Sequence, residues 1–362
     1  MSKELDKCLM CKNPQCLGCP CGTPVSEVIK LVRTSKIAAA QQALFENNPL
    51  SPITCEICPS FRFCQKSCVL SKTPKGGVDF SEIEKNVWSG RWRVKTQVLP
   101  RNGKKVLVIG SGPAGLSSAF YLSKRGFSVE VHEERGRFGG MLRYGIPDFR
   151  LDKTKINKII RILRNMGVII KSRSAVDLNN LQQIKTDGGF HGIIVATGAW
   201  ASKKLKIEGE DLPNVKTAIQ FLTTHHSAFH TPQIIVIGGG NVAVDCALVA
   251  AKKGACVKLC YRRGEADMKA YPHEINLAKN GGVVFEFNIA PKRITKDGVF
   301  FERGGEETFE KADLVVVAVG QSSDLKKSEI EGIYYIGDCI TGTATVVEAV
   351  AAAKDISLRF TE

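Results

Sequence analysis

The sequence lacks any apolar run long enough to cross a membrane. Its most apolar stretches, residues 314–319 and 349–353, fall far short of the roughly 20 residues that a spanning helix needs. The first ten residues, MSKELDKCLM, contain no apolar signal core. A composition of 43% hydrophobic and 24% charged residues also excludes a disordered, collagen-like or coiled-coil chain. We therefore expect a globular, cytoplasmic protein, and its 362 residues suffice for two or three domains.

Acidic residues are in deficit. The chain has 36 Asp and Glu against 51 Lys and Arg, a formal net charge of +15. This balance favours negatively charged partners such as nucleotides or an acidic protein surface, whereas nucleic acid is the less expected partner.

Cysteine is absent from residues 69–245, yet nine of the 13 cysteines lie in the first 68 residues. They form two groups, at positions 8, 11, 16, 19 and 21 and at positions 55, 58, 64 and 68. A reducing cytosol and an odd number of thiols argue against disulfides. Zinc is a second alternative, but zinc sites usually repeat a C-x2-C knuckle in pairs, and here one knuckle opens each group and is followed by a spacing of four or five residues. Iron–sulfur clusters fit the spacing and the two Cys-Pro steps best. Between the groups, apolar periodicity predicts one amphipathic helix over residues 25–45.

A strand entering a glycine turn follows the linker-like residues 88–105. The apolar run 106–109 leads into GSGPAG at 110–115 and then into a helical pattern, and the next strand ends in Glu133, 23 residues after the first glycine. This spacing is typical of a dinucleotide site. Gly110 permits the tight turn, Gly112 admits the pyrophosphate, and Gly115 lets the helix pack on the strand. The predicted contacts therefore include Gly110, Gly112, Pro113, Ala114, Gly115 and, for the ribose, Glu133.

The same unit recurs 128 residues later. Residues 234–237 enter GGGNVA at 238–243, and the following strand, 256–261, ends in two arginines. Guanidinium groups can clamp a 2′-phosphate but cannot accept a hydrogen bond from a 2′-hydroxyl, which predicts NADP(H). The alternative is that one or both arginines are simply solvated at a strand end. The predicted contacts are Gly238, Gly240, Asn241, Val242, Ala243, Arg262 and Arg263.

Two more buried-type strands end at glycine turns, one at Thr197 and Gly198 and the other at Gly320. Near the C-terminus, the strand 333–336 precedes Gly337 and Asp338, and a helical pattern covers 343–354, including Thr345. Asp338 can hold a flavin ribityl hydroxyl while the helix presents its first amides to the ring. The alternative is that Asp338 only caps that helix.

With these motifs, the chain resembles the glutamate synthase small-chain family over nearly its whole length. It is also similar to the N-terminal half of dihydropyrimidine dehydrogenase and to the large subunit of the bifurcating ferredoxin:NADP oxidoreductase. Further matching segments are GGMLRYGIP at 139–147, ATG at 196–198 and IGDCITGTATVVEAV at 336–350. The resemblance implies an α/β fold with two Rossmann-like domains behind a helical iron–sulfur domain. Residues 1–100 would hold two [4Fe-4S] clusters, residues 101–230 and 305–362 FAD, and residues 231–304 NADPH.

The resemblance also implies ligand sets. One cluster would take Cys8, Cys11, Cys16 and an oxygen of Glu84, and the other would take Cys19, Cys58, Cys64 and Cys68. The spacing after Cys16 departs from that of relatives, so the choice between Cys19 and Cys21 stays open, and Glu84 has the alternative of an exposed helix acid. The resemblance also implies that Gly140, Met141 and Leu142 contact the flavin cofactor.

The implied activity is that of an NADPH-dependent flavoprotein oxidoreductase. Hydride would pass between nicotinamide and flavin, and the clusters would carry electrons to a partner redox protein, either a glutamate synthase-like large chain or a ferredoxin-type carrier. Hydride transfer requires no catalytic acid or base. The alternatives are a subunit of a ferredoxin:NADP or sulfide-linked bifurcating oxidoreductase and, outside enzymes, a zinc-stabilised binding protein.

Overall fold

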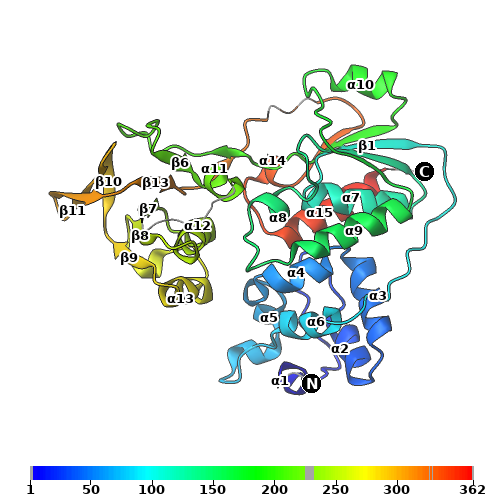
Figure 1. Ribbon diagram of the computed structural model, residues 1–362. Helices are drawn as coiled ribbons and strands as arrows, with labels where there is room; N and C mark the ends of the chain where they lie inside the picture. The colour runs from blue at the N-terminus through cyan, green and yellow to red at the C-terminus, as the bar shows by residue number, and fades with distance from the viewer. Residues whose placement is uncertain (1–2, 225–231, 326, 328, 361–362) are drawn as a thin grey trace. The chain divides into compact units, whose positions relative to one another are not determined.

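The computed structural model describes residues 3–224, 232–325, 327 and 329–360, which form two compact units (Figure 1). The first unit combines the chain up to residue 143 with residues 148–198 and the chain from residue 325. The second unit contains residues 144–147 and 199–324. The finer division into three domains, at residues 100, 230 and 305, stays a prediction.

Short helices, blue to cyan in Figure 1, make up the N-terminal part of the first unit. The helix predicted over 25–45 is in fact two helices, because Ser35 has a φ of 56°. The N–H groups of Ser35 and Lys36 donate back to the carbonyls of Val32 and Leu31, and these bonds end the first helix. The helices are α1 (Lys3–Lys7), α2 (Val25–Arg33), α3 (Ile37–Asn47), α4 (Ser51–Ile57), α5 (Cys64–Ser67) and α6 (Phe80–Trp88).

A five-stranded parallel sheet, in the order β15-β4-β1-β2-β3, forms the centre of the first unit. The chain passes from β1 through α7 (Pro113–Lys124) to β2 on one side, and β4 lies on the other side. Ligands of open α/β sheets bind where the strand order reverses in this way, outside the carboxyl ends of the strands. The strands are β1 (Lys105–Ile109), β2 (Ser128–His132), β3 (Ile169–Lys171), β4 (Gly192–Val195) and β15 (Ile333–Tyr335).

Helices cover this sheet. α7 packs against β1 and β2, and α15 (Val346–Arg359) packs along α7. α9 (Lys153–Asn165) contacts both α7 and α4 of the N-terminal helices. The remaining helices of this unit are α8 (Met141–Tyr144), α10 (Leu181–Asp187) and α14 (Asp338–Thr341).

The second unit repeats this plan with the parallel sheet β6-β13-β7-β8-β9. Successive residues of β7 point to opposite faces: Val236 belongs to the core beneath α12 (Asn241–Lys252), and Ile235 packs on the other face with Phe301. The sheet is formed by β6 (Val215–Thr217), β7 (Gln233–Ile237), β8 (Cys256–Tyr261), β9 (Val284–Phe287) and β13 (Leu314–Val317). Around it lie α11 (Ala218–Thr223), α13 (Pro272–Asn280), the pair β5 (Ala201–Ser202) and β14 (Gln321–Ser322), and the antiparallel strands β10 (Ala290–Thr295), β11 (Gly298–Arg303) and β12 (Glu306–Lys311).

The placement of β13 differs from the expected domain plan. We expected residues 305–362 to complete the flavin domain, but β13 pairs in parallel with β6 and β7 of the second sheet. It occupies the position next to β7 that β4 occupies next to β1 in the first sheet. Among the described residues, none of the helices is both long and apolar enough to cross a membrane.

Candidate functional site

The first glycine turn connects β1 to α7 with close backbone contacts. Gly110 has a φ of 101°, and a Cβ on it would lie 2.5 Å from the carbonyl oxygen of Ala196. A Cβ on Gly115 would overlap the carbonyl oxygen of Gly110, so only glycine lets the helix approach the strand this closely. The turn also meets the flavin-side loop, because a Cβ on Gly140 would lie 2.7 Å from the Cα of Gly112.

The N-terminus of α7 has no side-chain cap. Gly112 is the N-cap residue and Pro113 the first helical residue, so the first amides have no side-chain acceptor within the helix. Uncapped amides at a helix N-terminus form an anion site suited to a pyrophosphate. Ala114 follows on the same turn and is buried.

Glu133 is buried at the end of β2 and holds this turn in place. Its Oε2 atom accepts from the N–H and the hydroxyl of Ser111, at 3.0 and 2.5 Å, and its Oε1 atom accepts from the N–H of Arg135 at 2.9 Å. The Ser111 hydroxyl oxygen in turn accepts from the N–H of Gly139 at 3.0 Å. A carboxylate has about four acceptor positions, so capacity remains for a ribose hydroxyl. Sequence reasoning missed Ser111, although it lies inside the glycine motif.

The ends of three adjacent strands bring the flavin-side residues together. β4 pairs with β1 on one side and with β15 on the other, and Val195 lies opposite both Ile109 and Tyr335. The turn at 110–115 therefore shares one edge of the sheet with the segments that follow β4 and β15. These segments carry the predicted residues Thr197, Gly198, Gly337 and Asp338, while Met141 and Leu142 begin α8 after Gly140.

Asp338 and Thr345 have different roles at this edge. Burial raises the pKa of Asp338 to about 6, against the opposing hydrogen bond that its Oδ1 atom accepts from the N–H of Ala344 at 3.1 Å. Asp338 does not cap α15, because Thr345 is the N-cap residue of that helix. The Oε2 atom of Glu348 accepts from both the N–H and the hydroxyl of Thr345, at 2.7 Å each. The alternative reading of Asp338 as the cap of α15 is therefore wrong.

The second glycine turn connects β7 to α12. A Cβ on Gly238 would overlap the carbonyl oxygen of Ala318, and a Cβ on Gly239 would overlap the ring of Tyr261. Gly240 instead faces open space and is the N-cap residue of α12, again without a side-chain cap. The Oδ1 atom of Asn241 accepts from the N–H of Tyr271 at 2.8 Å. Of the other predicted residues, Val242 is exposed and Ala243 is buried in the first turn of α12. Gly320 follows β13, and its carbonyl oxygen accepts from the N–H of Lys203 at 3.0 Å.

Arg262 and Arg263 lie where β8 ends. Both side chains are exposed, and the guanidinium of Arg263 lies 5.7 Å from the centre of the Tyr261 ring. Arg262 forms no hydrogen bond or ion pair with the part of the chain that the structure describes. Its charge is thus available to an anion at the same sheet edge as Gly240.

All 13 cysteines are free thiols, which excludes the disulfide alternative in this structure. Within residues 3–224, 232–325, 327 and 329–360, no group of three or more Cys, His, Asp or Glu side chains is close enough to hold a single metal ion. One zinc ion would need four donors about 2.3 Å from a common centre.

The first three cysteines, Cys8, Cys11 and Cys16, lie near Cys68. A cavity of the first unit is lined by Cys8, Cys11, Cys16, Cys64 and Cys68. Burial raises the pKa of the Cys16 thiol, and three neighbouring thiols raise it further: Cys68, Cys8 and Cys11. The loop between Cys16 and Cys19 is pressed onto α5, because a Cβ on Gly18 would lie 2.8 Å from the carbonyl oxygen of Phe63.

Glu84 lies with the other cysteines. It is only 7% exposed, so the alternative of an exposed helix acid is wrong. Burial raises the pKa of Glu84 well above its ordinary value, the charge of Cys19 raises it further, and Lys155 opposes them. Burial is also the main cause that raises the pKa of Cys58, followed by Glu84, Cys64 and Cys19. Cys68 thus lies near Cys16. Glu84 lies near Cys58 because α6 packs against α4.

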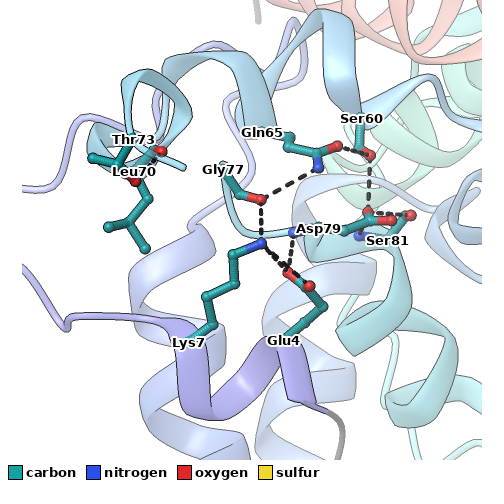
Figure 2. A network of polar contacts seen from close by, with 9 residues as sticks. All are labelled: Glu4, Lys7, Ser60, Gln65, Leu70, Thr73, Gly77, Asp79 and Ser81. Carbon is teal, nitrogen blue, oxygen red and sulfur yellow. Dashed lines mark hydrogen bonds and ion pairs between the residues drawn. The ribbon is translucent and has the colours of Figure 1, made fainter. Parts of the chain in front are cut away.

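A polar network holds the segment 60–79, which carries Cys64 and Cys68, against α1 (Figure 2). The Nζ atom of Lys7 donates to the carbonyl oxygen of Gly77 at 2.9 Å, and the N–H of Asp79 donates to Glu4 at 2.6 Å. The hydroxyl of Ser60 donates to Asp79 at 2.9 Å, and Gln65 donates to Gly77 at 3.3 Å. Because α1 leads directly into Cys8, this network sets the position of one cysteine group relative to the other.

Residues 104–353 match the family model of the pyridine nucleotide-disulphide oxidoreductases. The chain belongs to this family. Residues 1–95 match a second model, dihydropyrimidine dehydrogenase domain II with a 4Fe-4S cluster. The protein is therefore a flavoprotein oxidoreductase that uses FAD and a pyridine nucleotide and carries a 4Fe-4S domain. This confirms the predicted fold class and enzyme class.

Curated relatives support the predicted resemblance. The chain is 28% identical over 422 residues to the glutamate synthase [NADPH] small chain of Azospirillum brasilense, covering 98% of this chain and 87% of the relative. It is 29% identical to the NAD-dependent dihydropyrimidine dehydrogenase subunit PreT of Escherichia coli (strain K12), covering 98% and 92%. It is 31% identical to the NADP(+)-dependent formate dehydrogenase subunit beta of Moorella thermoacetica, covering 74% and 45%. The predicted likeness to glutamate synthase small chains and dihydropyrimidine dehydrogenase is confirmed.

Solved structures share the fold. A 2-naphthoyl-CoA reductase complex aligns with a TM-score of 0.64 and 23% identity, covering 76% of this chain and 42% of the other. The thioredoxin reductase of Lactococcus lactis aligns with a TM-score of 0.56 and 21% identity, covering 71% of this chain and 97% of the other.

Proposed function

We propose that the protein exchanges hydride between NADP(H) and FAD and passes single electrons through two [4Fe-4S] clusters to a partner redox protein. The observation that carries this proposal is that the cysteine-bearing helices and the flavin-type sheet form one compact unit, while the second nucleotide fold is a unit of its own. Bound flavin converts a two-electron hydride into single electrons, which iron–sulfur clusters carry.

The first unit fits FAD. The uncapped amides of α7 suit its pyrophosphate, Glu133 keeps acceptor positions for a ribose, and the Asp338 carboxyl lies at the same sheet edge. The chain's own part in hydride transfer is to orient the two nucleotides. No side chain has to take or give a proton for that step.

The N-terminal helices fit two clusters with revised ligand sets. Cys8, Cys11, Cys16 and Cys68 supply four thiolates around one cavity. Cys19, Cys58, Cys64 and the buried Glu84 supply the second set. Burial raises the pKa of Glu84, so its carboxylate form needs a nearby positive charge, such as that of a cluster iron, to be stable.

Paired substitutions test these sets. Cys16→Ser and Cys68→Ser should alter the electron paramagnetic resonance signal of one cluster, and Cys58→Ser and Glu84→Ala that of the other. Cys246→Ala, which removes a fully buried thiol of the second unit, is the control and should change neither. A Glu84→Ala signal that changes together with Cys16→Ser would restore the originally expected grouping and refute the revised one.

We infer NADPH as the nucleotide from Arg262, which is exposed at the end of β8 and has no side-chain partner among the described residues. The relative from Azospirillum brasilense is named for NADPH and the PreT relative for NAD, so names alone do not decide this choice. The charge at the ribose end of the site favours the phosphorylated form.

The partner is proposed to be an acidic redox protein that docks on the cysteine loops. Segments 9–20 and 58–77 contain five basic residues and no acidic residue. All five are exposed, and none forms an ion pair with a described residue: Lys12, Arg62, Lys66, Lys72 and Lys75. Apolar side chains are exposed between them, with Leu9 and Leu17 at 60% and 73%. Complementary charge would steer an acidic carrier to this surface.

Charge reversal tests the docking surface. A Lys66→Glu, Lys72→Glu double variant should slow reduction of an acidic ferredoxin and remove most of its dependence on salt, which screens charges over about 8 Å at physiological ionic strength. Lys253→Glu, an exposed lysine of the second unit, is the control. Unchanged rates and salt dependence would exclude this surface, and a partner that co-purifies through salt washes would favour a stable large chain instead.

The proposed function as a whole is tested by anaerobic titration with NADPH. We expect one FAD and about eight irons per chain, bleaching of the flavin and cluster absorbance, and electron paramagnetic resonance signals from reduced clusters. Stoichiometric zinc without acid-labile sulfide would refute the proposal. Full turnover of a small-molecule substrate after loss of both clusters would show a self-contained flavin reductase instead.

A further inference from the structure

The turn that follows Cys19 is attached to helix α15. The thiol of Cys21 donates to the carbonyl oxygen of Val347 at 3.1 Å, and Cys21 is only 2% exposed. The Nζ atom of Lys354 donates to the carbonyl oxygen of Cys21 at 3.2 Å. Val347 and Lys354 are seven residues apart and therefore lie on the same face of α15. Two contacts thus hold one residue of the cysteine loop on that face.

Further hydrogen bonds extend this attachment within the first unit. Lys354 also donates to the Oδ1 atom of Asn47 at 2.8 Å, and the hydroxyl of Tyr121 on α7 donates to the carbonyl of Asn47 at 2.5 Å. The backbone turn itself is closed by the N–H of Gly22, which donates to the carbonyl of Cys19 at 2.9 Å. The loop, α3, α7 and α15 therefore share one hydrogen-bonded network.

A side-chain hydrogen bond links the thiols of Cys19 and Cys21, but their other contacts differ. The Sγ atom of Cys19 lies 3.2 Å from the hydroxyl of Thr23 and is partly exposed. The Sγ atom of Cys21 is buried against a backbone carbonyl, which has a second lone pair beyond its helical hydrogen bond. The thiol of Cys21 is thus held against α15, whereas the thiol of Cys19 is partly exposed and makes no contact with that helix among the described residues. The geometry therefore separates the roles of the two cysteines.

We propose that Cys19 is the cluster ligand and that Cys21 is a positioning residue whose thiol fixes the ligand-bearing turn to the first turn of α15. This inference rests on the proposed function, because Ala344, the residue before the N-cap of α15, donates to Asp338 at the sheet edge assigned to the flavin. Cys21 thereby sets how far the Cys19 cluster site lies from that edge. It also accounts for a cysteine that the ligand sets do not use.

Four variants test the proposal in the full chain, purified without oxygen. Cys21→Ala should keep the iron, sulfide and FAD content of the unchanged protein, but cluster absorbance should bleach roughly tenfold more slowly after mixing with NADPH, a typical effect of losing an outer contact of a metal ligand. Cys21→Ser keeps a donor and should restore most of the rate. Cys19→Ser should lose about four irons. Cys246→Ala is the matched control and should behave as the unchanged protein.

Two results would overturn the proposal. Loss of about four irons in Cys21→Ala with retention in Cys19→Ser would make Cys21 the ligand. Bleaching of Cys21→Ala at the unchanged rate would show that the contact positions nothing. If Cys21→Ala does not fold, Cys21→Ser and Lys354→Ala take its place: a near-normal rate in the first and a slowed rate in the second support the proposal, and any other pattern refutes it. Failure of the proposed function is distinct, because then NADPH would bleach no cluster in the unchanged protein.

Discussion

Replacing Arg262 by alanine should convert a site that prefers NADPH into one that binds NADPH and NADH about equally well. The side chain is exposed at the end of β8, and it has no partner among the described residues that its loss would leave unpaired. A hydrogen bond to a charged group contributes about 1.5–3 kcal/mol. The dissociation constant for NADPH should therefore rise roughly 10- to 150-fold, while that for NADH should stay nearly constant.

The assay is competition by nucleotide fragments, which isolates the phosphate from the nicotinamide. In the unchanged protein, 2′,5′-ADP should compete with NADPH far better than 5′-AMP, and Arg262→Ala should abolish most of that difference. Lys253→Ala is the matched control, because Lys253 is an exposed cation at the opposite end of α12. Arg263→Ala is a second comparison, since its guanidinium lies over the Tyr261 ring that supports Gly239.

An equal loss of affinity for NADPH and NADH in Arg262→Ala would refute the reasoning. It would mean that the arginine supports the fold of the turn and does not read the phosphate. Raising the salt concentration provides an independent check, because a contact between exposed charges weakens as ions screen it.

The remaining predictions concern the turns, the C-terminal carboxyl and the clusters. Gly115→Ala should lower the free energy of unfolding by about 1–3 kcal/mol through overpacking. Gly240 faces open space, so Gly240→Ala should change the free energy of unfolding by less than about 0.5 kcal/mol and yet weaken NADPH binding. Thermal unfolding and nucleotide titration distinguish the two variants. Because the pKa of Asp338 is about 6 when folded and 3.8 ordinarily, the folded apoprotein binds more protons between these values, so its stability should fall by up to about 3 kcal/mol as pH rises through this window. Asp338→Asn should remove that slope, and an unchanged slope would contradict the assignment. Cys64→Ser should lose one cluster and keep FAD, as iron and flavin analyses would show, because the flavin motifs all lie beyond residue 100.

The glycine turns could be predicted from the sequence because their constraints are local. Gly110 and Gly115 meet atoms only a few residues away or on the adjacent strand, and any chain that enters a helix from a buried strand in this way meets the same limits. The strand that ends in Glu133 follows the same rule. For such elements, the order of residues nearly determines the geometry.

Features that depend on distant packing could not be predicted in this way. The break at Ser35 depends on a single residue with positive φ inside an otherwise helical pattern. The position of Glu84 beside Cys58 depends on how α6 packs against α4, and spacing along the chain says nothing of that contact. Likewise, the apolar sequence of β13 does not indicate which of the two sheets it joins. Only its pairing with β7 in the structure shows that it belongs to the second sheet.

The first unit is built from segments on both sides of an insertion, and this arrangement determines when that unit can be completed during synthesis of the chain. Residues 199–324, 126 in number, separate β4 from the strand β15 and the helix α15 that complete the same unit. At about 5–20 residues per second, the ribosome needs roughly 6–25 s to pass this stretch. During that interval Cys21 has no carbonyl to bind and the first sheet lacks its edge strand. In a growing chain, the Cys19 turn therefore reaches its final position only after α15 has been synthesised.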